Sequence, residues 1–200
     1  MTEIAGQTFS GEDWYGDDLA DGRWTACRFV DVDLTEASTR SAVFTDCVFE
    51  ACRFNASTHV SSAFVTCEFT RCNLFDATFE ACKLTGSTFT RCTMRPLRVL
   101  GGQWRGVGLR GAHLAGLDLS DLDLREADLS LADLTAATLR GARLSGAELH
   151  QTQLAKADLR GAALDGVDLG AAQLRRTTLD LTGAVLLAES KGAVVDVTGA

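Results

Sequence analysis

A leucine recurs at every fifth position from residue 109 to residue 179, fifteen times without a miss. A short phrase of alanine, aspartate and leucine often surrounds it, as in Ala127-Asp128-Leu129 and Ala132-Asp133-Leu134. A period of five matches neither the 3.6-residue repeat of a helix nor the two-residue repeat of a strand. Strict repetition at a short fixed period instead indicates a solenoid, in which each unit buries its apolar residue by stacking on its neighbours.

The same register extends backwards and covers almost the whole chain. In steps of five from Phe9 to Leu179 there are 35 positions, which we call the central positions. Of these, 33 carry a large apolar residue, and the exceptions are Thr39 and His59. The residue two places before each central position is small nearly throughout. We therefore expect both of these places to face the core.

This repeat resembles that of the pentapeptide-repeat family over about residues 7–181. The resemblance implies an all-β fold, a right-handed quadrilateral β-helix in which four pentapeptides make one square coil. About nine coils would follow, stacked as in other solenoids. A type II turn that begins at the central residue needs a positive φ two places later, which glycine adopts without steric cost. Glycine stands at that place at positions 106, 111, 116, 141, 146, 161 and 166.

We expect a single repeat domain over residues 1–181, with an aromatic-rich first half. Around residues 95–102, Pro96 and the pair Gly101–Gly102 interrupt the pattern, because proline has no backbone N–H to donate. A kink or local bulge is expected there, although the five-residue register survives it. From Leu109 onwards we expect the more regular half of the coil.

Residues 182–200 are expected to form a C-terminal helix and tail. The helix is predicted over residues 183–192, with Asp180 or Thr182 as its N-terminal cap and a final strand at residues 194–197. A solenoid end exposes unpaired backbone groups, so the helix should cover it. Its apolar side chains either serve this cap alone or also form a homodimer contact, which we favour, through Val185, Leu186 and Leu187.

The cysteines and histidines do not suggest a catalytic or metal site. All seven cysteines stand two places before a central residue, at positions 27, 47, 52, 67, 72, 82 and 92. We interpret them as small, buried and free thiols, since stacked rungs hold Cβ atoms about 4.8 Å apart, too far for an easy disulfide. In coils of twenty residues, His59 and Thr39 would be neighbours, either as a hydrogen-bonded pair or as a weak spot.

Motifs for catalysis or cofactor binding are absent from the sequence. It contains no nucleophile–base pairing, metal-ligand spacing or nucleotide-binding glycine motif. We therefore predict no enzyme activity, no cofactor and no metal. The first residues lack the basic and apolar regions of a signal peptide, and no apolar run approaches the length of a membrane span. A cytoplasmic protein without membrane contact is the expectation.

Charge is the informative surface feature. The chain carries 19 basic and 27 acidic residues, a net charge of −8, which argues against direct nucleic-acid binding. Residues 1–50 hold eleven acids against three bases. A second set of acids lies on predicted outward positions of the leucine repeat, and we take it as a candidate partner-binding face: Asp118, Asp121, Asp123, Glu126, Asp128, Asp133, Glu148, Asp158 and Asp168.

Two stretches narrow the resemblance within the family. Met94-Arg95-Pro96-Leu97 and the closing stretch from Leu179 are similar to those of the mycobacterial fluoroquinolone-resistance pentapeptide proteins, DNA mimics that bind DNA gyrase. The resemblance implies a rod that pairs end to end through its C-terminus. Related Qnr proteins carry protruding loops, for which the unbroken register here leaves no room. Drug protection is therefore less strongly implied than gyrase binding, and self-immunity to a gyrase-targeting product is equally open.

The expected shape agrees with a DNA mimic. About nine coils at roughly 4.8 Å each make a rod near 40 Å long, and two rods would span a little over two turns of B-DNA. An acidic rod of that size can occupy a basic DNA-binding saddle. The alternative is a non-enzymatic repeat scaffold that binds another, unknown protein.

Overall fold

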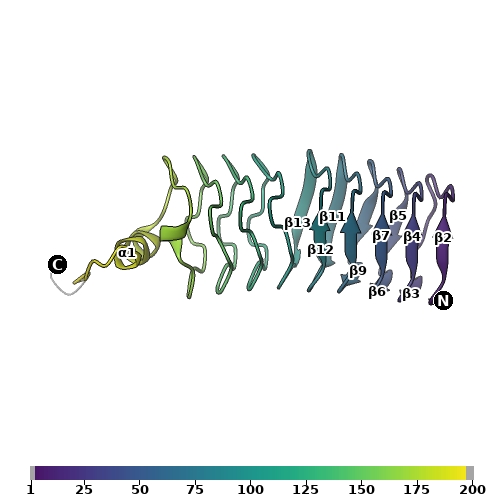
Figure 1. The fold of residues 1–200 in the computed structure, drawn as a ribbon, viewed down its shortest axis with the longest axis horizontal. Helices are drawn as coiled ribbons and strands as arrows, with labels where there is room; N and C mark the ends of the chain where they lie inside the picture. Colours follow the sequence, from purple (N-terminus) through teal and green to yellow (C-terminus); the bar gives the residue numbers. More distant parts are fainter. Residues whose placement is uncertain (1–2, 197–200) are drawn as a thin grey trace.

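The structure, a computed structural model, describes residues 3–196 and shows a parallel β-helix. The N-terminus lies at one end of a rod and helix α1 (Leu181–Ser190) at the other (Figure 1). One sheet contains β1 (Glu3–Ala5), β3 (Arg23–Thr25), β6 (Val43–Thr45), β9 (Ala63–Val65), β11 (Ala77–Lys83), β8 (Thr58–Val60), β5 (Ser38–Arg40) and β13 (Leu97–Gln103). The second contains β2 (Thr8–Ser10), β4 (Arg28–Val30), β7 (Val48–Glu50), β10 (Glu68–Thr70) and β12 (Thr88–Thr90).

Neighbouring strands pair in parallel with residues twenty positions apart. Phe29 lies opposite Phe49, for example, and Phe49 opposite Phe69. Beyond Gln103 the structure assigns no further strand among the described residues, and single-residue parallel bridges continue the same register as far as Thr178. The predicted β-helix is confirmed. Strands, however, build only about five coils, fewer than the nine expected, and turns build the rest.

The turns follow the sequence prediction in the later part of the rod. The N–H of Ala112 donates to the oxygen of Leu109 over 3.0 Å, and Gly111 between them has a φ of +67°. A positive φ at the third residue of such a closed turn is the mark of type II. We call residues 109–169 the leucine half, because a leucine fills every central position in it.

The earlier part, which we call the aromatic half (residues 3–103), has a different core. Rings of Phe9, Phe29, Phe49, Phe69 and Phe89 stack in one column with centroids 4.6–5.0 Å apart and interplanar angles of 6–16°. Each buried ring contributes roughly 2–3 kcal/mol of hydrophobic free energy, with about 0.5–1.5 kcal/mol more from each stacked pair. This column ends where the leucine half begins.

The two polar central residues form a hydrogen-bonded pair. Thr39 Oγ1 lies 2.9 Å from His59 Nδ1, and Ser57 Oγ lies 3.0 Å from His59 Nε2. The Ser57 hydroxyl donates to the Phe54 oxygen over 2.7 Å, and the Thr39 hydroxyl donates to Ser62 Oγ over 2.8 Å. Burial lowers the pKa of His59 to about 3. The network satisfies every polar atom of the ring inside the core.

Helix α1 (Leu181–Ser190) follows the last coil, after a 3-10 turn at Leu169–Ala171. Asp180 caps the helix by accepting the N–H of Gly183 over 2.9 Å, and its second oxygen accepts the N–H of Gly161 over 2.7 Å. The expected final strand is absent at residues 194–196, and Val197 lies outside the described residues. None of the described helices is both long and apolar enough to cross a membrane.

Candidate functional site

The predicted acidic residues lie on outward positions of the leucine half. Asp128 bridges Glu148 in the next coil, and Asp118 is linked through Thr138 to Asp158 two coils on. Asp168 shares a surface cleft with Glu148. The twenty-residue register therefore brings these acids into vertical rows, as the sequence indicated.

Most of these acids also have a local structural role. An aspartate directly before a central leucine accepts the backbone N–H two residues further on, over 2.9–3.4 Å. This contact fixes the start of each type II turn. Six of the nine predicted site residues make it: Asp118, Asp123, Asp128, Asp133, Asp158 and Asp168.

Arginines neutralise part of the predicted face. Asp123 is buried between Arg125 at 2.8 Å and Arg143 at 3.1 Å, so a partner protein cannot reach it. Glu126 pairs with Arg105 and Asp158 with Arg160, each at 2.6 Å through two hydrogen bonds. Asp128 lies 3.9 Å from Arg110. Arg143 stands one coil from Asp123, a pairing that the twenty-residue period could have revealed.

These ion pairs hold the carboxylates in their charged form. Hydrogen bonding from Arg160 lowers the pKa of Asp158 to about 2, and Arg125 and Arg105 likewise lower the pKa values of Asp123 and Glu126. The pKa of Asp133 is lowered by its bond from Thr135, with smaller contributions from His113 and Arg95. All these groups are therefore anionic at neutral pH.

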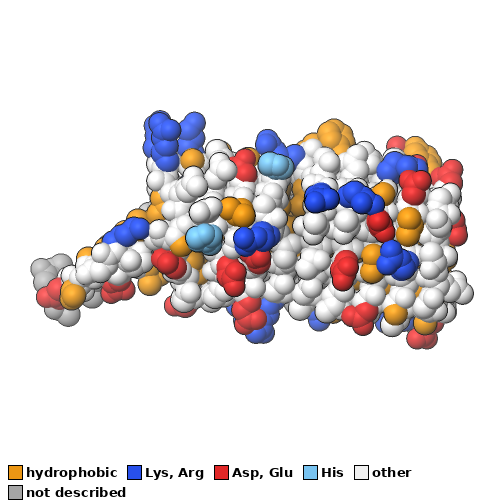
Figure 2. Space-filling model, viewed as in Figure 1, with side chains coloured by type: hydrophobic (Ala, Val, Ile, Leu, Met, Phe, Trp, Pro, Cys, Tyr) orange, Lys and Arg blue, Asp and Glu red, His pale blue; other side chains and the backbone are white. Residues whose placement is uncertain are grey.

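Asp121 and Glu148 are the freest members of the set. Among the described residues, neither side chain forms an ion pair or hydrogen bond. Asp121 occupies a corner with a φ of +57°. Both are therefore available to an external cation. Figure 2 shows that acidic and basic side chains are interspersed on the visible face, so the leucine half has no continuous acidic stripe there.

Net charge is distributed very unevenly along the rod. Residues 1–50 account for the whole net charge of −8, and the remaining 150 residues hold equal numbers of acids and bases. Between Glu80 and Asp118 there is no acid at all. We call the bases in that interval the basic belt, which sequence reasoning missed although the sequence displays it: Lys83, Arg91, Arg95, Arg98, Arg105 and Arg110.

The residues predicted at the dimer contact are only partly available. Leu186 and Leu187 pack against the core of the last coils, while Val185 is half-buried. Leu181, one turn before Val185 on the same side of the helix, is 77% exposed. Any second copy would therefore meet a surface centred on Leu181 and Val185 more than on the two leucines.

All seven cysteines are free; six are buried and Cys92 is half-buried. Six of the thiols donate to the carbonyl oxygen of a central residue in the preceding coil, as Cys67 does to Phe44 over 3.4 Å and Cys47 does to Trp24 over 3.5 Å, and Cys27 donates to Ile4. Burial raises the pKa of Cys82 to about 11. Within residues 3–196, no three His, Cys, Asp or Glu side chains converge as a metal site would require. These thiols stabilise the coil.

Solved structures share this fold. QnrB1, a plasmid-mediated fluoroquinolone resistance protein, matches with a TM-score of 0.67 and 19% identity over 96% of this chain and 100% of that one. A trypsin-treated variant of QnrB1 matches with a TM-score of 0.56 and 20% identity, over 97% of this chain and 100% of that one. HetL is a protein involved in heterocyst differentiation regulation in the cyanobacterium Nostoc sp. strain PCC 7120. It matches with a TM-score of 0.45 and 20% identity, over 92% of this chain and 89% of that one.

The sequence itself matches one family model. No curated protein matches the chain. The model for pentapeptide repeats matches residues 67–95 and the overlapping spans 105–141, 132–170 and 142–180, which together make up just over half of the chain. No catalytic family is indicated by any of these matches. The five-residue register, the parallel β-helix and the model agree, and the chain belongs to the pentapeptide-repeat family.

Proposed function

We propose that this protein is a non-enzymatic DNA mimic that binds and inhibits DNA gyrase, a type II topoisomerase. The observation that carries the proposal is the concentration of acidic charge on a slender parallel coil, with a net −8 in residues 1–50 and rows of acids in the leucine half. Such a rod competes with DNA for a basic saddle through the same Coulomb and counterion terms. The fold of QnrB1, a fluoroquinolone resistance protein, supports this class of function.

The contact surface is proposed to include the acids that lack an arginine partner. Asp118, Asp121 and Glu148 present carboxylates on the outside of neighbouring coils, and no described base lies within 4 Å of them. Asp123, Glu126 and Asp158 would contribute less, because their charge is already paired. Resistance to a gyrase-targeting antibiotic, self-immunity included, would follow from this binding in a cytoplasmic protein.

Homodimerisation through helix α1 belongs to the same proposal. Leu181 and Val185 offer an apolar strip that two copies can bury by two-fold pairing, the commonest arrangement for such a patch. Changing Leu181 and Val185 to Glu should give a monomer in analytical ultracentrifugation. A wild-type protein that remains monomeric at high concentration would reject the dimer.

Gyrase supercoiling assays test the function. We expect wild-type protein to inhibit supercoiling, with inhibition weakening steeply as salt is added. Reversing Asp118, Asp121 and Glu148 to Lys should remove inhibition without unfolding the coil. The matched control reverses Asp17, Asp18 and Asp21, of which Asp18 and Asp21 occupy the same register positions as Asp118 and Asp121, five coils away.

The two charge-reversal variants distinguish a contact surface in the leucine half from one in the N-terminal coils. Loss of inhibition only in the Asp17, Asp18 and Asp21 variant would move the contact surface to the N-terminal coils. No binding of wild-type protein to gyrase at low salt would reject the DNA-mimic function and favour a scaffold for another protein.

A further inference from the structure

In the part of the chain that the structure describes, two of the four sides of the ladder are missing at the step where the aromatic half meets the leucine half. Thr88 bridges Gly108 and Gln103 bridges Asp123, so two sides of the square are joined. On the other two sides, within the described chain, no backbone hydrogen bond or bridge joins residues 90–100 to residues 110–120. Figure 1 shows a wider spacing at this step than between the neighbouring coils.

Two kinds of turn meet at this step. The turn that begins at Phe89 is open, because no N–H three residues later bonds to the Phe89 oxygen. The turn in the next coil, which begins at Leu109, is closed by the N–H of Ala112 donating to the Leu109 oxygen. The residues just beyond, 96–104, are also the ones that the family model leaves unmatched between its spans. The gap is therefore a feature of this chain more than of the repeat.

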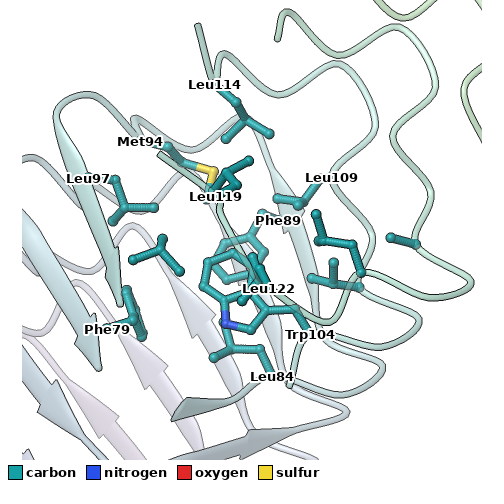
Figure 3. Close-up of a cluster of buried hydrophobic side chains, with 14 of the residues drawn as sticks. Phe79, Leu84, Phe89, Met94, Leu97, Trp104, Leu109, Leu114, Leu119 and Leu122 are labelled. Carbon is teal, nitrogen blue, oxygen red and sulfur yellow. The ribbon is translucent and has the colours of Figure 1, made fainter. Parts of the chain in front are cut away.

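The gap forms a cleft of about 310 Å³. Its floor is apolar, with Phe89, Met94 and Ala112 in its lining. Figure 3 shows Met94 and Phe89 in the hydrophobic cluster that continues into Leu109 and Leu114. The space-filling view shows a narrow hollow between the two halves of the rod, with hydrophobic side chains at its bottom (Figure 2). The volume is at the lower end of the range for small-molecule sites, about 300–1,000 Å³.

The rim of this cleft is cationic. Arg91, Arg110 and His113 line it, and Arg91 has no ion pair within 4 Å among the described residues. Arg110 has one ion-pair partner within residues 3–196, Asp128, at 3.9 Å. The backbone N–H groups of Arg91 and His113 lack the cross-coil bonds that Arg71 and Asp133 make at equivalent places. Amide and guanidinium N–H groups that line one cleft favour an oxyanion.

We propose that this junction cleft binds a small organic anion, an apolar body that carries a carboxylate or a phosphate. The apolar floor accommodates the body, and Arg91 and Arg110 pair with the oxyanion. Lys83, Arg91 and Arg95 of the basic belt have no ion pair among the described residues, so their charge favours the approach of an anion to this step of the rod. The site is separate from the acidic residues proposed for gyrase.

Calorimetric titration of the full-length protein with 2-naphthoate and with 2-naphthyl phosphate tests the proposal. Saturable 1:1 binding of at least one probe is expected, with 2-naphthamide, the uncharged analogue, binding about tenfold or more weakly. The stronger of the two anions identifies the preferred oxyanion. Absence of saturable binding for both anions would overturn the proposal.

Substitutions of residues that line the cleft test whether the anion binds there. Arg91→Gln combined with Arg110→Gln should weaken binding about tenfold or more, whereas Arg23→Gln combined with Arg40→Gln should leave it unchanged. Ala112→Leu should fill the cleft and block binding, while Ala162→Leu, at the equivalent place after Leu159, should not. Equal binding by all four variants would show that the anion binds elsewhere.

Cys92 gives a readout that is independent of affinity. It lines the cleft and is half-buried, whereas the other six cysteines are buried. Bound probe should slow its alkylation by iodoacetamide, followed by mass spectrometry of the Cys92 peptide. An alkylation rate unaffected at saturating probe would contradict the assigned position.

Discussion

The aromatic half and the leucine half follow the same five-residue register and yet use different backbones. In the aromatic half, three-residue strands carry most central residues, whereas in the leucine half every coil is built from closed turns and single bridges. Both bury the central side chain. The five-residue period therefore determines which side chains point inward, whereas the residues between the central positions determine the backbone conformation that connects one side of the square to the next.

An aspartate before the central residue favours a turn, although turns also form after Thr138 and Arg143. No aspartate or asparagine precedes a central residue within any strand, and those places hold residues such as Thr58, Val43 and Val48. Where aspartate stands there, its side chain captures the N–H two residues later and favours a turn over a ladder. Asp33 in the aromatic half behaves in this way too, and its side is turn-built.

Carbonyl oxygens of central residues are satisfied differently in closed and open turns. In a closed turn, the Leu109 oxygen accepts the N–H of Ala112. In an open turn this bond is missing, and a thiol or hydroxyl from the next coil donates instead, as Cys67 does to Phe44 and Ser87 to Phe64. Cysteine and serine are therefore frequent in the aromatic half because a donor is needed there.

The largest expected effect comes from placing an unpaired charge in the leucine half. Leu139→Asp should prevent folding, at a cost of about 4 kcal/mol or more, because Leu139 is buried in an apolar column with no polar network like that of His59. Circular dichroism and thermal unfolding measure this. Ala136→Asp, on an exposed corner, is the control and should fold. An unchanged melting temperature for Leu139→Asp would show that this half lacks a tightly packed core.

Much of the fold was predictable from the sequence, because the inward pattern depends only on side-chain period. The core register, the inward cysteines and the helix capped by Asp180 could all be predicted. The strand and turn halves were not distinguished, although the aspartates before central residues carried the signal. After Leu109 the coil is the more regular half, as expected, because closed turns and single bridges repeat in its described residues without a strand.

The candidate site was less predictable. The acidic positions could be predicted from the register, but their pairing with Arg105, Arg125 and Arg160 depends on side-chain conformation across coils and corners. The junction cleft arises from missing backbone bonds between two coil types, and no single residue marks such an absence. A periodic pattern predicts only the features that repeat along the chain. It therefore could not predict a cleft that forms where the repeated bonds between coils are missing.

The buried pair Thr39 and His59 makes the aromatic half sensitive to acid. The pKa of His59 is about 3 in the folded protein and about 6.5 when unfolded, so folding requires the neutral ring. This stability is complete above about pH 6.5 and falls as pH drops towards 3, by roughly 2 kcal/mol at pH 5. Urea unfolding between pH 7 and pH 5 measures the loss.

The control for this pH dependence removes the titrating group. Thr39→Val combined with His59→Leu should retain a packed core and lose about 2 kcal/mol less between pH 7 and pH 5. A wild-type protein whose stability declines no more than that of the double variant would contradict the assignment of a neutral, buried ring.

Thiol donors are expected to matter by about 1 kcal/mol each. Cys67→Ala removes the donor to the Phe44 oxygen and should lower stability by that amount, whereas Cys67→Ser should retain the bond, as Ser87 shows with Phe64. Urea midpoints of the two variants give the comparison. If alanine is as stable as serine, then cysteine acts there only as a small apolar residue.

The smallest expected effect tests the aspartates of the leucine half. Asp133 accepts the N–H of Thr135 over 3.0 Å, so Asp133→Ala should cost about 1 kcal/mol, and Asp133→Asn, which keeps the acceptor, much less. Glu68, exposed before a central residue on a strand, is the matched position, and Glu68→Ala should change stability by less than about 0.5 kcal/mol. Equal losses at Asp133 and Glu68 would mean that the turn contact does not distinguish the two halves. The rows of aspartate could then be assigned to partner binding alone, since local folding would no longer explain them.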